Sequence, residues 1–253
     1  MLVAAACRAH AGDARRLPID RERGARLLRS LVCCIALIGY GGMAAGAQDS
    51  AKWVEGTHYF LLQPAQPTST PGKIEVLDVF SYACPACNQF QPTVDRLKAA
   101  LPANAQIAYL PAAFNPAEDW PVFQRAFLAA QILGVAEQSH DAMYDAVWGN
   151  GSLAIMDKAT RRLLSRAQQP TIEDVAKFYA RYGVKADAFV ATATSFTVDS
   201  QMKHCDAQIR DYQVDGTPTL IVNGKYRLTP TSAGGFLQTI DLVLYLVARE
   251  SGK

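Results

Sequence analysis

Two cysteines, Cys84 and Cys87, lie where a predicted strand is followed by a predicted helix. The strand is the β-branched and apolar run Ile74–Phe80, which we expect to be buried on both faces, with Asp78 as its one misfit. Beyond it apolar residues recur at helical spacing, so a helix should begin close to Cys84, with Pro85 in its first turn. Free N–H groups and the positive end of the helix dipole stabilise a thiolate there, and the thiolate is the form of cysteine that attacks disulfides.

The spacing of the two cysteines predicts a reversible pair. Cys87 lies one turn after Cys84 on the same side of the helix and can form a disulfide with it at low strain. Half of a zinc site is an alternative, but no second pair of cysteines or histidines follows at ligand spacing. A purely structural disulfide is another, although so short a loop would restrict the unfolded chain little. A strand, a Cys-x-x-Cys motif and a helix in this order favour redox chemistry.

The composition argues against several other classes of function. The chain has 253 residues, of which 50% are hydrophobic, and a formal net charge of +2. These values support one or two globular domains and give no argument for nucleic acid or an anionic membrane as a partner. The sequence has neither a glycine-rich phosphate loop nor a Gly-x-Ser-x-Gly motif, and its four histidines are not at metal spacing, so we expect no bound metal.

The amino-terminal segment has the features of a secretory signal peptide. The basic segment Arg21–Arg29 precedes the apolar run Leu31–Ile38, and Ala45–Ala47 has the Ala-x-Ala pattern of a cleavage site. We therefore expect residues 1–47 to be cleaved off. The apolar run is shorter than the roughly 20 residues of a membrane span, although an uncleaved anchor is an alternative. Export would place the cysteine pair in an oxidising compartment.

Strand and helix signals alternate in the first part of the mature chain. Thr57–Leu62 predicts a short first strand, and Gln106–Leu110 predicts a strand after the helix that follows Cys87. Ile74–Phe80, the helix that begins close to Cys84 and Gln106–Leu110 would form a right-handed parallel strand-helix-strand unit. Helical patterns dominate from about residue 115 to residue 212.

The last part of the chain predicts a hairpin and a helix. Thr219–Val222 and Lys225–Leu228 are strand signals on either side of Asn223–Gly224, a dipeptide typical of tight hairpin turns. An amphipathic helix then ends the chain, and we expect Thr231 or Ser232 to cap it.

The surroundings of the cysteines resemble the active site of the thioredoxin superfamily. Asp78 stands six residues before Cys84 and matches the buried acid of that superfamily, so the resemblance implies that it carries protons for Cys87. Phe80–Tyr82 followed by Cys-Pro-x-Cys is more similar to the DsbA family of bacterial periplasmic thiol:disulfide interchange proteins than to cytosolic thioredoxin. The resemblance therefore implies that Cys84, Cys87 and Asp78 are the catalytic residues.

A second match, Asp215–Pro218, comes directly before the hairpin. By itself it is an ordinary turn, because only about 5–6% of X–Pro bonds in folded proteins are cis. The resemblance implies that Pro218 follows a cis bond and packs against the cysteine pair, and that Thr217 exposes main-chain groups to an extended substrate. We expect Pro85, Ala86, Thr217 and Pro218 to bind the substrate.

The order of elements implies an α/β, thioredoxin-like fold with an inserted helical domain, as in the DsbA family. Residues 48–114 and 213–253 would form the thioredoxin-like domain, and residues 115–212 the inserted helical domain. Cys205 falls on an apolar helix face of the insertion. We expect it to be a buried and inert thiol, and a regulatory or intermolecular bond is the alternative.

The resemblance also implies the function. The chain would be a periplasmic thiol:disulfide oxidoreductase that introduces disulfide bonds into exported proteins at Cys84 and Cys87, without a cofactor. The implied partners are unfolded exported proteins with free thiols and a membrane reoxidase of the DsbB type; we expect a monomer and no nucleic acid. The alternatives are a periplasmic disulfide reductase or isomerase of the same fold and a non-enzymatic peptide-binding chaperone.

One position departs from the DsbA family. Members of that family usually carry histidine before the second cysteine, whereas this chain has Ala86. Alanine offers neither a positive charge nor a hydrogen bond to the sulfur of Cys84, so we predict a less acidic Cys84 and a milder oxidant than the Cys-Pro-His-Cys type. Asp78 replaces the glutamate common in the family, with the same role expected.

Overall fold

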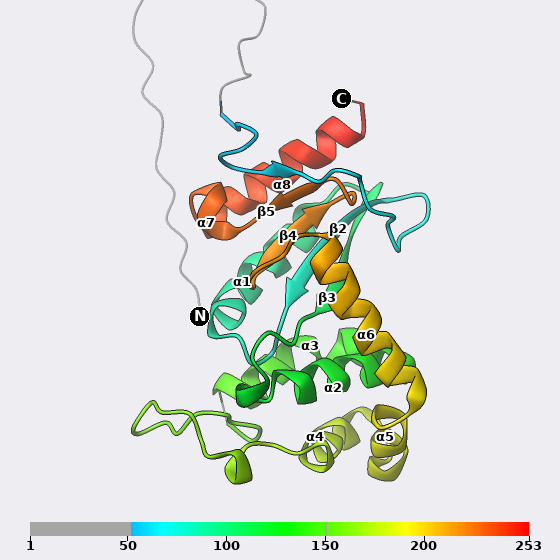
Figure 1. Ribbon diagram of the computed structural model, residues 1–253, viewed down its shortest axis with the longest axis vertical. Helices are drawn as coiled ribbons and strands as arrows, with labels where there is room; N and C mark the ends of the chain where they lie inside the picture. Colours follow the sequence, from blue (N-terminus) through cyan, green and yellow to red (C-terminus); the bar gives the residue numbers. More distant parts are fainter. Residues whose placement is uncertain (1–51, 150, 253) are drawn as a thin grey trace, which may run out of the picture. The chain divides into compact units, whose positions relative to one another are not determined.

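A five-stranded mixed sheet organises the part of the chain that the computed structural model describes, residues 52–149 and 151–252 (Figure 1). The predicted signal peptide, residues 1–47, lies outside the described residues. In spatial order the strands are β1 (Phe60–Leu61), β5 (Tyr226–Leu228), β4 (Thr219–Val222), β2 (Ile74–Phe80) and β3 (Ala105–Pro111). Only β2 and β3 are parallel, and the other neighbours are antiparallel.

The helices follow the predicted order. They are α1 (Pro85–Ala100), α2 (Trp120–Ile132), α3 (Ala136–Tyr144), α4 (Ile172–Tyr179), α5 (Ala186–Ala193), α6 (Phe196–Asp211), α7 (Pro230–Ala233) and α8 (Phe236–Glu250). Helix α1 connects the parallel strands β2 and β3, and α2 to α6 lie between β3 and β4 in the chain. None of the helices in the described residues is long and apolar enough to cross a bilayer.

Strand β2 lies in the interior of the sheet, between β4 and β3, and its residues from Glu75 to Phe80 are buried. Its Val76 belongs to one core cluster with apolar residues of α1 and α8, whereas Leu77 and Val79 belong to a second cluster with residues of α2 and α3. Side chains alternate along a strand, so Asp78 has the parity of Val76 and lies on the face covered by α1. The buried carboxylate is thereby placed on the side of the helix that begins at the cysteines.

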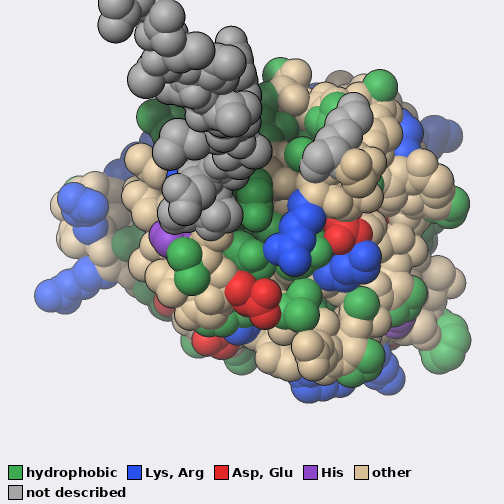
Figure 2. Space-filling view, turned by 90° about the horizontal axis from the view of Figure 1, so that it is seen from above, with side chains coloured by type: hydrophobic (Ala, Val, Ile, Leu, Met, Phe, Trp, Pro, Cys, Tyr) green, Lys and Arg blue, Asp and Glu red, His purple; other side chains and the backbone are tan. Residues whose placement is uncertain are grey.

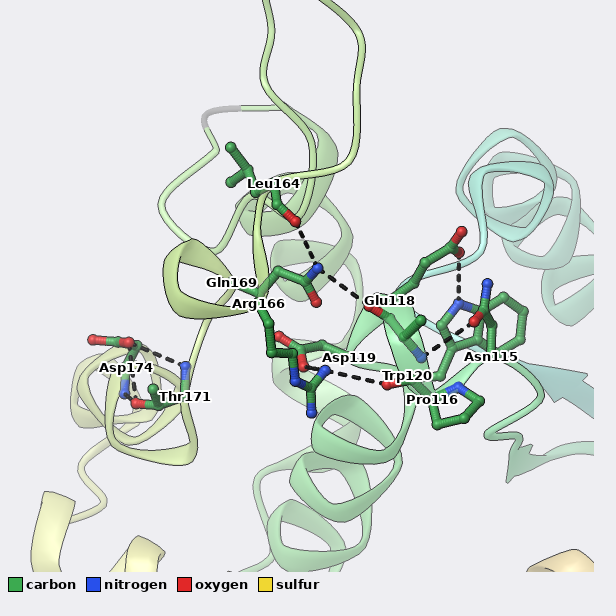
Figure 3. A network of polar contacts seen from close by, with 11 residues as sticks. Asn115, Pro116, Glu118, Asp119, Trp120, Leu164, Arg166, Gln169, Thr171 and Asp174 are labelled. Carbon is green, nitrogen blue, oxygen red and sulfur yellow. Dashed lines mark hydrogen bonds and ion pairs between the residues drawn. The ribbon is translucent and has the colours of Figure 1, made fainter.

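A polar network ties the segment before α4 to the start of α2 (Figure 3). Arg166 forms an ion pair with Asp119, whose side chain is 3% exposed. The amide of Gln169 donates hydrogen bonds to the carbonyls of Ala117 (3.2 Å) and Leu164 (2.8 Å). These contacts satisfy main-chain groups that a connecting segment would otherwise leave unpaired.

Most of the predicted elements are confirmed, and two details are wrong. β1 is limited to Phe60–Leu61 instead of Thr57–Leu62. The predicted cap of the last helix is also wrong, because Thr229 caps the extra short helix α7 and α8 begins after Gly235. The hydroxyl of Thr229 accepts a hydrogen bond from the N–H of Ser232 (3.0 Å), so the hydroxyl-rich segment caps a one-turn helix.

Charges of both signs mix on the surface. On the face shown in Figure 2, Lys and Arg side chains lie beside Asp and Glu side chains and beside hydrophobic ones. The ion pairs of the described residues include Lys52–Asp241 (3.1 Å) and Lys225–Glu250 (2.6 Å). This face therefore carries no extended field of one sign.

The hairpin turn predicted at Asn223–Gly224 is confirmed. Both residues have positive φ, 52° and 65°, as the two central residues of a type I′ turn require, and the N–H of Lys225 closes this turn on the carbonyl of Val222 (3.0 Å). The turn also contacts the connection before β2, because the N–H of Gln66 donates a hydrogen bond to the carbonyl of Gly224 (2.8 Å). A Cβ atom at Gly224 would lie 2.0 Å from the carbonyl oxygen of Gln66.

We therefore expect Gly224→Ala to lower the free energy of unfolding by roughly 3 kcal/mol or more, through the combined effects of positive φ and this clash. Gly56→Ala is the matched control, because Gly56 has φ of +79° and open space around it. It should cost only about 1–2 kcal/mol. Urea unfolding of both variants measures the difference, and equal losses would mean that the contact with Gln66 contributes nothing.

Candidate active site

The turn that ends β2 places Cys84 at the start of α1. Cys84 is the N-cap residue, with φ −86° and ψ 117°, and Pro85 is the first helical residue, as predicted. The N–H of Cys84 donates to the carbonyl of Ser81 (3.1 Å), and the hydroxyl of Ser81 accepts a hydrogen bond from the N–H of Ala83 (3.2 Å). The local turn therefore fixes where the first thiol stands.

The sulfur of Cys84 is surrounded by polar groups from two segments. It accepts a hydrogen bond from the N–H of Cys87 (3.4 Å), and its thiol donates to the carbonyl of Thr217 (3.5 Å). Both cysteines are free thiols in the structure, and only 5% of Cys84 and 3% of Cys87 is exposed. Both thiols are therefore largely shielded from solvent.

These surroundings separate the acidities of the two thiols. The pKa of Cys84 is lowered from 9.0 to about 6, and hydrogen bonding by the Cys87 thiol is the largest cause. Hydrogen bonds with Thr217 and with the N–H groups of Cys87 and Ala86 also lower this pKa, whereas burial raises it. The pKa of Cys87 is raised well above 9.0, chiefly by burial and also by its hydrogen bond to Cys84. At neutral pH Cys84 is therefore a thiolate beside a protonated Cys87.

Asp78 is buried near both sulfurs. It is 2% exposed, and its Oδ1 has no hydrogen-bond partner among the described residues. Burial and, to a lesser extent, the charge of Cys84 together raise the pKa of Asp78 from 3.8 to about 7. Asp78 also adds to the raised pKa of Cys87. A carboxyl group that titrates near neutral pH can both give and take a proton.

The segment before β4 closes the other side of the site. The peptide bond between Thr217 and Pro218 is cis, as the resemblance implied. A cavity of about 250 Å³ lies beside it. Its lining brings together three of the predicted substrate residues, Ala86, Thr217 and Pro218. Pro85, the fourth, is exposed at the first position of α1.

The same cavity contains residues that the sequence analysis did not assign to the site. Thr229, Pro230, Thr231 and Phe236 line it, and the ring of Phe236 packs edge-on against Phe90 of α1 at 5.2 Å. Of these residues Thr231 was predicted only as a possible helix cap, and nothing in the sequence pointed to Thr229. Position beside the cysteines is a tertiary property that local spacing does not encode.

Two hydrogen bonds, with His140 and Trp148, fix Tyr82 in the turn before Cys84. The hydroxyl of Tyr82 is hydrogen bonded to Nδ1 of His140 (2.8 Å), and the indole N–H of Trp148 donates to the carbonyl of Tyr82 (2.8 Å). Burial lowers the pKa of His140 to about 3, so His140 is neutral. The helical segment thus supplies the groups that fix Tyr82, and no local pattern in the sequence predicts them.

Cys205 differs from Cys84 in the acidity of its thiol. It is buried in α6, and burial raises the pKa of its thiol to about 12, with a smaller contribution from the charge of Asp206. A thiol of this acidity is a poor nucleophile at neutral pH. The predicted burial is confirmed, and His204 beside it is exposed.

We predict that Cys84 titrates with a midpoint of about pH 6 in the reduced protein, measured as thiolate absorbance near 240 nm against a Cys84→Ser reference. Ala86→His should lower the midpoint, because an imidazolium next to the sulfur favours the thiolate. A midpoint near 9 in the parent protein would contradict the assigned surroundings of Cys84.

The raised pKa of Asp78 predicts that the free energy of unfolding also depends on pH. Its pKa in the folded protein lies above its ordinary value, so the stability associated with protonated Asp78 is fully present below about pH 4 and is lost as the pH rises through about 7. The loss amounts to at most about 4 kcal/mol, since each pKa unit corresponds to about 1.4 kcal/mol. Asp78→Asn should therefore remove this loss in urea unfolding of the reduced protein between pH 4 and pH 8. Asp241→Asn, at an exposed site, is the control, and parallel pH profiles for the parent and Asp78→Asn would contradict the burial of a titrating carboxyl group.

Comparison with known proteins identifies the family. Residues 75–239 match the family described as DSBA-like thioredoxin domain. The thiol:disulfide interchange protein DsbA of Pseudomonas aeruginosa is 36% identical over 220 residues, which cover 87% of this chain and 95% of that protein. The protein of the same name from Azotobacter vinelandii is 33% identical over 227 residues, covering 88% of this chain and 98% of that protein.

Solved structures agree with these matches. The crystal structure of the oxidoreductase DsbA from Xylella fastidiosa gives a TM-score of 0.69 at 33% identity and covers 80% of this chain and all of that one. The crystal structure of Pseudomonas aeruginosa DsbA gives a TM-score of 0.66 at 35% identity, covering 79% of this chain and 96% of that one. The chain therefore belongs to the DsbA family of thioredoxin-like proteins.

Proposed function

We propose that this protein is a thiol:disulfide oxidoreductase that introduces disulfide bonds into exported proteins at Cys84 and Cys87. The observation that carries the proposal is the difference between the two thiols, an acidic Cys84 at the helix N-terminus beside a protonated, buried Cys87. Relatives named thiol:disulfide interchange protein DsbA, matched over nearly their whole length, support it.

The reaction begins with the Cys84–Cys87 disulfide. A substrate thiolate attacks the sulfur of Cys84, the bond between the two cysteines breaks, and a mixed disulfide forms while Cys87 leaves and takes up a proton. A second substrate thiolate then attacks the substrate sulfur of the mixed disulfide and releases Cys84 as a thiolate. The substrate loses two electrons and the cysteine pair gains them. The low pKa of Cys84 makes it a good leaving group in this second step.

Asp78 is proposed to supply the proton that Cys87 takes up. Cys87 has a pKa well above neutral, so it must be protonated as it leaves, and both residues are shielded from water. The pKa of Asp78, about 7, lets it hold a proton before the reaction and recover one afterwards. In this role Asp78 acts on the reacting sulfur through proton transfer.

The substrate is proposed to lie along Thr217 and Pro218, with Pro85 and Ala86 on the opposite side. The carbonyl oxygen of Thr217 lies 3.5 Å from the sulfur of Cys84, so a chain bound along Thr217 would pass beside the reacting atom, and the adjoining cavity of about 250 Å³ leaves room for a substrate side chain. Main-chain hydrogen bonds of this kind recognise an extended chain without requiring one sequence. That suits an enzyme acting on many unfolded proteins.

The partners follow from the redox balance. An interchange protein of this family has substrate proteins and a redox partner, since each cycle leaves the cysteine pair reduced. We propose that the partner is a membrane reoxidase of the DsbB type, that the site of action is the periplasm, and that the protein works as a monomer. The signal-peptide pattern in residues 1–47 supports export.

We also propose the division into domains that the sequence suggested. Residues 48–114 and 213–253 would form the thioredoxin-like domain, and residues 115–212 the inserted helical domain. In support, all five strands of the sheet lie outside residues 115–212, whereas α2 to α6 lie inside them. The cysteine pair and the segment of Thr217 would then belong to the same domain.

We expect Cys84→Ser to abolish oxidation of a reduced, unfolded ribonuclease in a refolding assay, because the remaining described thiols, Cys87 and Cys205, are buried and have raised pKa values. In a buffer whose oxidised glutathione accepts the two electrons, Cys87→Ser should instead accumulate mixed disulfides between Cys84 and the substrate, visible on non-reducing gels, because no second thiol of the pair displaces the substrate. Cys205→Ala is the control and should keep the parent activity. A fully active Cys84→Ser protein would overturn the proposed function.

A further inference from the structure

Strand β3 has a free edge in the part of the chain that the structure describes. It pairs only with β2. The N–H of Ile74 donates a hydrogen bond to the carbonyl of Asn104, and the N–H of Ala112 donates one to the carbonyl of Phe80. The even-numbered residues of β3 therefore direct their main-chain groups toward β2. Ile107 and Tyr109 therefore direct theirs outward, where no described residue pairs with them.

The features that usually protect such an edge are missing from its middle. Gln106–Leu110 contains neither a charge nor a proline, although natural edge strands are commonly blocked by these. Only the ends are satisfied: the N–H of Ala105 donates to Pro102 (2.9 Å), and the amide of Gln124 donates to the carbonyl of Pro111 (3.0 Å). The opposite edge of the sheet, β1, is two residues long.

A groove follows this edge. It has a volume of about 780 Å³ and is lined on one side by the end of α1, including Lys98, and on the other by α2 and α3, including Glu137. Ile107 and Tyr109, at its base, are half-buried. The ion pair Lys98–Glu137 (2.5 Å) joins the two walls. Its side chains are 47% and 80% exposed, and exposed pairs of this kind are weak, so it can open.

We propose that an extended segment of the substrate polypeptide binds in this groove as an additional strand on β3. The inference deepens the proposed function and rests on it for the identity of the bound chain. The register of β2 and β3 places Pro111 beside Phe80, four residues before Cys84, so a chain held at Cys84 can continue to this edge. Ala105–Tyr109 offers about 16 Å of strand at about 3.3 Å per residue.

The charges of the groove favour an acidic residue in the bound segment. Lys73 lines the groove, and its ammonium group has no partner among the described residues. Opening of the Lys98–Glu137 pair would free a second cation together with the carboxylate of Glu137, so Lys73, Lys98 and Glu137 leave the groove with a net charge of +1. Main-chain pairing to β3 therefore provides binding without a sequence requirement, and the lysines add a preference for Asp or Glu.

The test uses a cysteine-free octapeptide of alternating Thr and Val with a terminal Asp, added to the reduced protein and followed by amide NMR. The N–H signals of Ile107 and Tyr109 should shift. Ile107→Pro should weaken binding about fivefold or more by removing one outward donor, at a position where an edge strand tolerates proline. Ile107→Val keeps the donor and should bind like the parent. Glu137→Gln should bind more tightly, because it frees Lys98.

Several results would overturn the proposal. One is that the NMR signals shift only for residues around Thr217 and Ala86. Another is that the Ile107→Pro variant binds the peptide with the same affinity as the parent protein. A third is that the protein self-associates through β3 with increasing concentration in place of binding the peptide. If Ile107→Pro fails to fold, the shifts in the parent protein decide. The peptide has no thiol, so it binds or fails to bind independently of exchange at Cys84 and Cys87. Failure of the docking groove and failure of the proposed function are therefore separate outcomes.

Discussion

Unequal stabilisation of two thiolates within the first turn of α1 is the constraint on which the rest of this structure depends. Cys84 receives the N–H and the thiol of Cys87 as hydrogen-bond donors, whereas Cys87 is buried and stays protonated. A disulfide carries no thiolate, so every interaction that stabilises the Cys84 thiolate favours the dithiol and strengthens the protein as an oxidant. The side chain of Ala86 adds no charge to this balance, and Ala86 helps to lower the pKa of Cys84 to about 6 only through its main-chain N–H.

The surrounding fold keeps this turn rigid and dry. Strand β2 ends at Phe80, and Tyr82 is then held by His140 and Trp148 from the helical segment, 58 and 66 residues further along the chain. Burying Asp78 without a partner for its Oδ1 costs free energy, and the proton transfer to Cys87 that we propose would account for a carboxyl group at this place. The helical segment thus does more than cover the sheet, since it fixes the residue two positions before the reactive sulfur.

How much was predictable from the sequence depended on whether the signal was local. Apolar runs and helical spacing placed β2, α1 and the hairpin, because these periodicities act within a few residues. The role of Thr217–Pro218 needed a family resemblance, since nothing local marks a cis bond. His140, Trp148 and Phe236 were missed because they reach the site through tertiary contacts. The cap of the last helix was misplaced because Gly234 and Gly235, both with positive φ, separate α7 from α8.

The reduction potential of the Cys84–Cys87 couple tests the account most directly. It can be measured by equilibrating the protein with glutathione buffers and separating the dithiol from the disulfide form. A Cys84 pKa of about 6 predicts a couple between the roughly −270 mV of thioredoxin and the roughly −120 mV of the Cys-Pro-His-Cys type. A value near −270 mV, typical of thioredoxin, would contradict the account and favour a reductase that needs an electron donor.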